Sequence, residues 1–310
     1  MEGVPQGAFE RARYRDYLTL AKPGITGLIL LVAVAGFFLA SPKAFSVPRL
    51  LILLVTGASA SAGAAMLNHY LDRDLDATMK RTRDRPLPGA RIRSEISVGA
   101  AGLALSALGV GAATVFLNPL TGFSILLGSL TYVVVYTIWL KRRSSWNIVI
   151  GGFAGSAPAL AGSAAAVGSW TPGVLALALL VFLWTPPHFW SLAILLKDDY
   201  QRAGLPMLPR MNDLQYSGRV VVVSAALLVP AAGLVALYGP VTWPAAIVLL
   251  ALGLLFVWLS APLWHDTARS VARRGFIYSG PYLLLVVGAL VLNWGLLALG
   301  VPVGPSRLVP

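Results

Sequence analysis

Long apolar runs dominate the chain, and short polar segments separate them. Nine of these runs have about 17 to 25 residues, the length that an α-helix needs to cross a membrane. The runs are continuous and do not alternate between apolar and polar positions, which disfavours a transmembrane β-barrel. The pattern predicts an all-α bundle of nine transmembrane helices, at residues 24–40, 50–70, 95–117, 119–140, 146–167, 172–195, 219–239, 242–262 and 278–299.

The composition supports a membrane location. Hydrophobic residues make up 57% of the 310 residues and charged residues 12%, whereas a soluble domain carries about 25% charged residues. Several runs are rich in Gly, Ala and Ser, as at residues 58–65, and small side chains let helices pack closely in lipid. The chain has no cysteine, which excludes disulfides, thiolate metal sites, iron–sulfur clusters and thiol nucleophiles.

The basic residues lie on one side of the predicted bundle. The N-terminal segment and four alternate loops contain all of the 24 Lys and Arg residues except Lys43, Arg49 and Arg307. The positive-inside rule therefore places these segments in the cytoplasm and the C-terminus outside. Membrane topology explains the net charge of +12, so we predict no nucleic-acid partner. We expect the central cavity of the bundle to open to the cytoplasm.

An oxygen-rich stripe marks the end of the second predicted helix. Asn68, Asp72 and Asp76 are four residues apart, so on a helix they drift by about 40° and rise by about 6 Å at each step. Carboxylates at a membrane boundary are costly unless they are paired or hold a cation. Two carboxylates and an amide suit Mg²⁺, which completes its shell with water and substrate phosphate. The alternative is a solvated helix end whose acids neutralise nearby basic residues.

Two basic groups are candidates to bind a phosphate at this stripe. Lys80, Arg81 and Arg85 follow the stripe in a loop that two prolines stiffen. Lys141 and Arg142 end the fourth predicted helix, where the helix dipole already favours cations. Each group therefore has two interpretations, a phosphate-binding role and ordinary anchoring at the cytoplasmic face.

The sixth predicted helix carries a third candidate region. A Pro-Pro pair interrupts its backbone hydrogen bonds, and His188 follows within the membrane. The imidazole of His188 is a candidate ligand of a heme iron, and the alternative is a histidine that is only hydrogen-bonded. His69 lies beside the stripe, and His265 is predicted to be solvated. Asp198 and Asp199 end the helix, so we expect them level with the stripe.

These motifs are similar to those of a known family, in matching order from about residue 22 to the last predicted helix. The stripe and the Arg-Pro-Leu-Pro loop resemble the first signature of the UbiA-type intramembrane prenyltransferases. Thr-Pro-Pro-His-Phe-Trp at 185–190, and Asp-Tyr at 199–200 followed by Met-Leu-Pro at 207–209, resemble the heme-farnesylating branch of this family. The second Asp-rich motif of the family is reduced here to Asp198 and Asp199. The match through Asp-Tyr favours Asp199 as the ligand and leaves the number of metal ions open.

The resemblance implies a Mg²⁺-dependent transferase. It would move the farnesyl group of farnesyl diphosphate to a vinyl group of heme B, with addition of water, to give heme O and diphosphate. The implied metal ligands are Asn68, Asp72, Asp76 and Asp199. The implied diphosphate-binding residues are Asn68, Lys80, Arg81, Arg85, Lys141 and Arg142. The implied catalytic residues are Asp72, Asp76, Asp199 and Lys141, and the heme-contacting candidates are His188 and His69.

Two alternatives to this function remain at the level of sequence. One is a prenyltransferase of the same architecture that acts on an aromatic quinone precursor or on chlorophyllide. The other is a transporter, in which intramembrane acids mark an ion path. The acids here are not spread through the predicted helices and only one helix is visibly broken, which argues against a transporter.

The expected organisation follows from the same considerations. We predict a cytoplasmic N-terminal segment at 1–23, one transmembrane prenyltransferase domain at 24–299 and an external tail at 300–310. The resemblance implies the plasma (inner) membrane of a bacterium. The expected partners are farnesyl diphosphate, heme B and membrane lipids, and heme A synthase or a terminal oxidase are further candidates.

Overall fold

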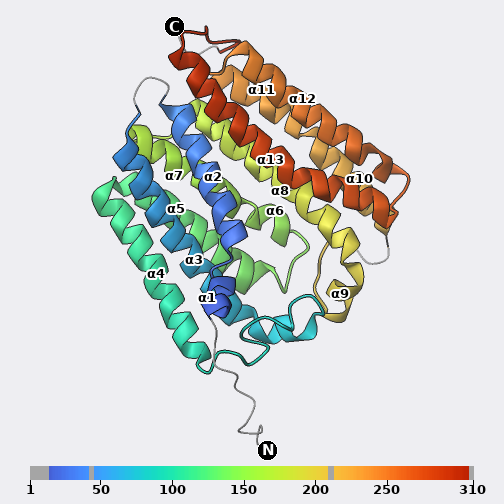
Figure 1. Cartoon of the computed structure of the whole chain (residues 1–310). Coiled ribbons are helices and arrows are strands. Elements are labelled where there is room, and N and C mark those ends of the chain that lie inside the picture. The colour runs from blue at the N-terminus through green and yellow to red at the C-terminus, as the bar shows by residue number, and fades with distance from the viewer. Residues whose placement is uncertain (1–13, 42–44, 209–212, 307–310) are drawn as a thin grey trace, which may run out of the picture.

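Long helices run side by side in the computed structural model, which describes residues 14–41, 45–208 and 213–306 (Figure 1). Within these ranges nine helical spans are long and apolar enough to cross a membrane, and each overlaps one of the predicted runs. The all-α bundle is therefore confirmed. The predicted features at Lys43, Arg307, Pro209 and the first thirteen residues lie outside the described residues.

The elements follow one another without any strand in the described residues. Four spans consist of two consecutive elements: α5 and η1, α6 and α7, α10 and α11, and α12 and η2. The bounds are α1 Tyr14–Leu20, α2 Pro23–Ala40, α3 Val47–Thr78, α4 Glu95–Phe116, α5 Pro119–Leu130, η1 Thr131–Leu140, α6 Asn147–Gly151, α7 Phe153–Val167, α8 Pro172–Leu195, α9 Lys197–Arg202, α10 Leu214–Ala226, α11 Leu228–Tyr238, α12 Trp243–Ser260, η2 Ala261–Trp264 and α13 Arg269–Ala298.

Prolines and a capping side chain set where several helices begin. α2, α5 and α8 start at Pro23, Pro119 and Pro172. The missing N–H of proline has no helical partner at that position, and its fixed φ already suits the helix. Asn118 caps α5, because its Oδ1 accepts a hydrogen bond from the backbone N of Thr121 at 2.9 Å.

Two helices extend beyond their predicted ends into polar sequence. α3 continues to Thr78, although its apolar run ends at about residue 70. α13 begins at Arg269, before the apolar run that starts at about residue 278. The longer α3 carries both Asp72 and Asp76 in helical conformation, which confirms the helical spacing assumed for the stripe.

The fourth span changes its geometry halfway. α5 is α-helical, whereas η1 continues the same span as a π-helix. At its end the backbone N of Lys141 donates to the carbonyl oxygen of Tyr136, five residues back, at 2.8 Å. Such wider turns occur frequently at functional sites, and this one delivers Lys141 into the candidate site described below.

The basic segments gather at one end of the bundle, as the charge pattern predicts. α1, the loop after α3 and α9 all lie there, and the C-terminal end of α13 lies at the opposite end (Figure 1). Three ion pairs join these segments to one another: Arg91 with Asp16, Arg142 with Asp74, and Arg269 with Asp198. The alternate loops are therefore on the same side of the bundle.

Large apolar side chains cover the outside of the bundle. Val115 is 76% exposed, Leu292 72% and Trp258 70%, and many other leucines, valines and isoleucines are exposed on the long helices. A soluble protein rarely exposes so extensive an apolar surface. Together with the nine spans, this surface identifies a multi-pass membrane protein whose outer face contacts lipid.

The close approach of α2 and α7 depends on two glycines. A Cβ on Gly162 would lie 2.1 Å from the carbonyl oxygen of Ala33. A Cβ on Gly36 would lie 2.2 Å from the carbonyl oxygen of Ala159. The two backbones touch because neither glycine carries a side chain, as is common for helices packed in a membrane.

We expect Gly162→Ala to lower the free energy of unfolding by about 1–3 kcal/mol, because the added methyl group forces α2 away from α7. Thermal unfolding of the purified protein in nanodiscs measures the change. Gly111→Ala in α4 is the matched control, since a Cβ there meets no atom within 4 Å. Its helix propensity should make the control equally or slightly more stable than the original protein. Equal stability of the two variants would contradict the packing argument.

Candidate active site

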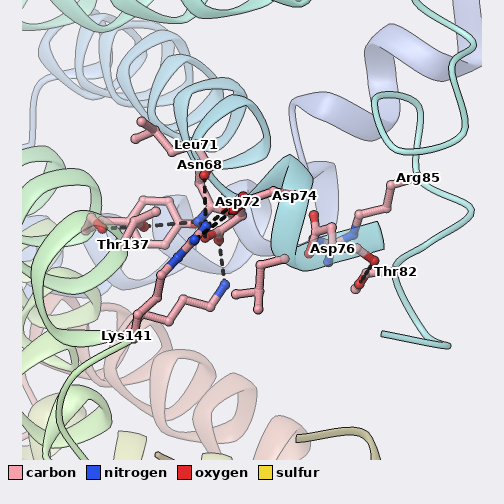
Figure 2. Close-up of polar contacts among 12 residues, drawn as sticks. Asn68, Leu71, Asp72, Asp74, Asp76, Thr82, Arg85, Thr137 and Lys141 are labelled. Carbon is pink, nitrogen blue, oxygen red and sulfur yellow. Dashed lines mark hydrogen bonds and ion pairs between the residues drawn. The ribbon is translucent and has the colours of Figure 1, made fainter. Parts of the chain in front are cut away.

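α3 places the three side chains of the stripe inside the bundle. Asn68 is 3% exposed, Asp72 1% and Asp76 2%. Asn68 Nδ2 donates to Asp72 Oδ2 at 2.7 Å and to Thr137 Oγ1 of η1 at 3.0 Å (Figure 2). A solvated helix end, the alternative considered from the sequence, does not fit side chains that are so deeply buried.

Each buried carboxylate of the stripe is paired with a cation from another segment. Lys141 Nζ, just past η1, lies 2.5 Å from Asp72 Oδ2. Arg85 Nη1, in the loop after α3, lies 2.7 Å from Asp76 Oδ2. Figure 2 shows Lys141 and Arg85 approaching the stripe from opposite sides. Two of the predicted diphosphate-binding residues therefore lie at the stripe, where they compensate its buried negative charge.

Lys22 is a third cation at the stripe, and it belongs to none of the sequence motifs. Its Nζ donates to Asn68 Oδ1 at 2.5 Å and to the hydroxyl of Tyr132 at 3.0 Å. Burial, followed by the charges of Arg85 and Lys141, lowers the pKa of Lys22 to about 7. The sequence signal for Lys22 is only its place directly before the proline that starts α2.

Lys22 also has an unusual backbone conformation. Its φ is 46° and its ψ is 61°, in the left-handed region, at the N-cap of α2. A non-glycine residue in this region is strained by about 1–3 kcal/mol, and such residues cluster at functional sites. The conformation and the hydrogen bonds of Lys22 together indicate that this side chain belongs to the site.

Arg142 lies at the edge of the site. Its guanidinium forms two hydrogen bonds with the exposed carboxylate of Asp74, at 2.7 and 2.8 Å. These bonds raise the pKa of Arg142 above its usual value. Its Nη2 is 4.0 Å from Asp72 Oδ1, which is too far for a hydrogen bond. Arg142 therefore adds positive charge beside the stripe without contacting it directly.

Asp199 connects α9 to the loop that follows the stripe. Its carboxylate is 8% exposed and is paired with Arg202. Burial raises the pKa of Asp199, but the hydrogen bonds from Arg202 and from the backbone N–H groups of Arg81 and Lys80 outweigh it, so the pKa lies below its usual value. Asp198 is exposed instead, because neighbouring residues on a helix point about 100° apart. The side chains of Lys80 and Arg81 are also exposed.

The three predicted carboxylate ligands are not gathered into one cluster. Among the described residues, no group of three or more His, Asp or Glu side chains is placed to hold a metal ion. Asp72, Asp76 and Asp199 are each paired with a basic residue instead. One observation fits a cation nonetheless: Asp72 Oδ1 is buried and has no hydrogen-bond partner. A carboxylate oxygen in that state is a suitable ligand for Mg²⁺.

His188 lies in a stack of rings between α8 and α13. Its imidazole is 4.6 Å from the ring of Trp184 and 5.2 Å from the ring of Phe276, between centroids. Its Nδ1 is 2.5 Å from Ser279 Oγ. α8 remains one helix through the Pro-Pro pair, so the prolines remove hydrogen bonds without ending it. No motif in the sequence indicates Ser279 or Phe276, which come from α13, a helix distant along the chain.

The other two histidines differ in exposure. His69 is 1% exposed on α3 next to Asn68. Its implied contact with heme stays a prediction. His265 is exposed, as predicted for a solvated residue.

The fold and the site together define a polytopic membrane enzyme whose buried, cation-rich centre suits an anionic substrate. The sequence model of the UbiA prenyltransferase family matches residues 29–280. The chain belongs to this family.

Similar proteins carry a more specific name. The protoheme IX farnesyltransferase of Metallosphaera sedula is 43% identical, over 91% of this chain and 97% of its own length. That of Sulfurisphaera tokodaii is 39% identical, over 89% of this chain and 92% of its own length. The protoheme IX farnesyltransferase of Hahella chejuensis is 37% identical, over 90% of this chain and 93% of its own length.

Solved structures share the fold at low identity. A structure of digeranylgeranylglyceryl phosphate synthase matches with a TM-score of 0.74 at 17% identity, over 90% of this chain and 98% of the other. A UbiA homolog from Archaeoglobus fulgidus bound to DMAPP and Mg²⁺ matches with a TM-score of 0.68 at 18% identity, over 89% and 99%.

Removal of the cation beside Asp72 is expected to destabilise the fold. Lys141→Met leaves a buried carboxylate unpaired and should lower the free energy of unfolding by about 3–5 kcal/mol. Arg143→Met, at an exposed position two residues on, should stay within about 0.5 kcal/mol. Thermal unfolding of the purified variants compares them.

A second substitution tests the reason for this loss. Asp72→Asn added to Lys141→Met removes the uncompensated charge and should recover part of the stability. A Lys141→Met variant as stable as Arg143→Met would show that the pair does not compensate buried charge.

Proposed function

We propose that the protein transfers the farnesyl group of farnesyl diphosphate to a vinyl group of heme B, with addition of water, to give heme O and diphosphate. The observation that carries the proposal is the buried stripe of Asn68, Asp72 and Asp76 with its paired cations. The choice of substrates is supported by relatives named protoheme IX farnesyltransferase, which are 37–43% identical to this chain.

The stripe would hold the metal ion. Asn68, Asp72 and Asp76 are the proposed ligands, and Asp199 would join them from α9. A Mg²⁺ ion held by these residues would supply positive charge that neutralises part of the charge of the diphosphate. Asp72 Oδ1, which accepts no hydrogen bond, supports this assignment, as does the Archaeoglobus fulgidus homolog bound to DMAPP and Mg²⁺.

The cations that now neutralise the carboxylates would turn to the diphosphate. Lys141 and Arg85 lie against Asp72 and Asp76. From these positions both side chains would donate to phosphate oxygens of a diphosphate held at the stripe. Lys80, Arg81 and Arg142 are proposed as further contacts at the rim. Lys141 and Arg85 would thus neutralise the carboxylates in the free site and the diphosphate when it is bound.

These fixed charges would promote the chemical step. Ionisation of the carbon–oxygen bond leaves an allylic farnesyl cation and a diphosphate whose new charge Lys141 and Arg85 stabilise. The heme vinyl group attacks the farnesyl cation, water captures the resulting cation beside the porphyrin, and a proton is released. The apolar interior of the bundle would hold the farnesyl chain in a central cavity and exclude water that would trap the first cation.

We propose the following topology and location. The N-terminal segment 1–23 and the basic loops would face the cytoplasm of a bacterial inner (plasma) membrane. Residues 24–299 would form the catalytic domain and 300–310 an external tail. Support comes from the basic segments that meet at one end of the bundle. Heme A synthase or a terminal oxidase, as users of heme O, are the proposed protein partners.

The role of the stripe is tested by two neighbouring aspartates. Asp72→Asn should lower heme O formation by about 100-fold or more, because a proposed metal ligand loses its charge. Asp74→Asn is the matched control, two residues along α3, with a side chain that is 63% exposed. The control should retain activity within about twofold, as expected for an exposed pair. Chromatography of the extracted hemes measures both, and near-normal turnover by Asp72→Asn would refute the metal site.

The choice of acceptor is tested with purified protein and labelled farnesyl diphosphate. Heme B should become farnesylated, whereas 4-hydroxybenzoate should not. Removal of divalent cations with EDTA should abolish the reaction, and Mg²⁺ should restore it. Labelling of 4-hydroxybenzoate alone would favour the quinone-precursor alternative over the proposed function.

A further inference from the structure

Ser279 holds the imidazole of His188 across the interface of α8 and α13. Its Oγ is 2.5 Å from His188 Nδ1 and 2.5 Å from the carbonyl oxygen of Phe276, three residues back on α13. Ser279 is fully buried, at 0% exposed. The hydroxyl group therefore has two partners at hydrogen-bond distance and no contact with solvent.

The two partners determine where the hydroxyl proton lies. A carbonyl oxygen only accepts hydrogen bonds, so the proton of Ser279 lies between its Oγ and the carbonyl oxygen of Phe276. Ser279 Oγ then offers only lone pairs to His188. Nδ1 of His188 must donate, which requires a proton on Nδ1. In a neutral imidazole the other nitrogen, Nε2, is then unprotonated.

We propose that Ser279 is a positioning residue that fixes His188 in the tautomer whose Nε2 binds the iron of the heme substrate. This inference rests on the proposed function, in which heme B is the acceptor. Iron-binding histidines commonly donate their other ring N–H to a protein acceptor, which fixes the ring and increases its electron donation to the metal. Ser279 Oγ is such an acceptor.

The ring stack fixes the remaining freedom of the imidazole. The plane of His188 is inclined by 16° to Trp184 and by 29° to Phe276, and both rings stack on the imidazole. The lone pair of an imidazole nitrogen lies in the ring plane, and Nδ1 already contacts Ser279, so Nε2 is the ring atom left for an iron ligand. The stacked rings and the hydrogen bond from Nδ1 together hold the imidazole in one orientation.

One residue anchors both rings of α8, but through different atoms. Trp184 Nε1 donates to the backbone carbonyl oxygen of Ser279 at 2.8 Å. His188 contacts the side-chain hydroxyl instead. Ser279→Ala therefore removes the partner of His188 and keeps that of Trp184, which makes it a specific test.

Proline residues lie close to this contact on both helices. α8 carries the Pro-Pro pair directly before His188, and α13 carries Pro281 two residues after Ser279. Proline removes a helical hydrogen bond, and within a membrane the freed groups need other partners. Prolines on both sides of one interface are consistent with a functional contact there.

The test uses full-length protein in nanodiscs, titrated with heme B. Soret absorbance gives the heme dissociation constant, and resonance Raman of the ferrous complex gives the iron–histidine stretching band. Ser279→Ala should weaken heme binding by about 10- to 100-fold. It should also shift the band to lower frequency, because His188 loses the acceptor that increases its electron donation. A purely structural role of Ser279 would leave the band in place.

Three further variants control the test. Ser279→Thr keeps a hydroxyl and should restore the band, and Ser279→Cys, with its weaker acceptor, should give an intermediate shift. Ser260→Ala removes another fully buried serine, on α12, and should match the original protein. His188→Ala should lose the band, and added imidazole should bring it back.

The outcomes separate this inference from the proposed function. Original affinity and an original band in Ser279→Ala would overturn the role of Ser279. A protein that makes heme O but shows no histidine band, with unchanged heme affinity in His188→Ala, would overturn the iron ligand and leave the proposed function standing. Failure to form heme O from heme B would overturn the proposed function itself.

Discussion

Two carboxylates buried within a membrane bundle are the constraint on which the rest of this structure depends. Asp72 and Asp76 are almost inaccessible, and a charge in that position must be compensated. Their partners come from separate segments, Lys141 after η1 and Arg85 in the loop after α3. Lys22 joins them through Asn68. Electrostatic compensation therefore fixes how the end of the fourth span and the start of α2 sit against α3.

The helices could be predicted because the membrane imposes a minimum length on each apolar run. The ends of the helices were harder to predict from the sequence, for a physical reason. The hydropathy of the sequence falls at the boundary between lipid and water, whereas a helix ends where its backbone hydrogen bonds end. α3 and α13 extend past the lipid–water boundary into polar sequence. The residues of greatest chemical interest on α3 lie in that overlap, where only their four-residue spacing revealed them.

The site was predictable only in part, since spacing reveals neighbours on one helix and not contacts between helices. The stripe, Lys141 and Arg85 were found from local motifs. Lys22 was missed because its value comes from a contact with Asn68 across the bundle. Asp199 was expected level with Asp72 and Asp76; it is paired with Arg202, and the described residues hold no cluster of three carboxylates. The position of the short helix α9 is set by packing, which no spacing rule describes.

The π-helical η1 has a consequence for how this chain can vary. In a π-helix each residue contributes a smaller rotation than in an α-helix, and Lys141 reaches Asp72 only at the end of this wider winding. Loss of a single residue from the segment without a change in its winding, or a return to α-helical winding at the same length, would change the direction of every following side chain. The number of residues between α5 and Lys141 is therefore constrained as strictly as their identity. Insertions and deletions, tolerated in many surface loops, would here disconnect the lysine from its carboxylate.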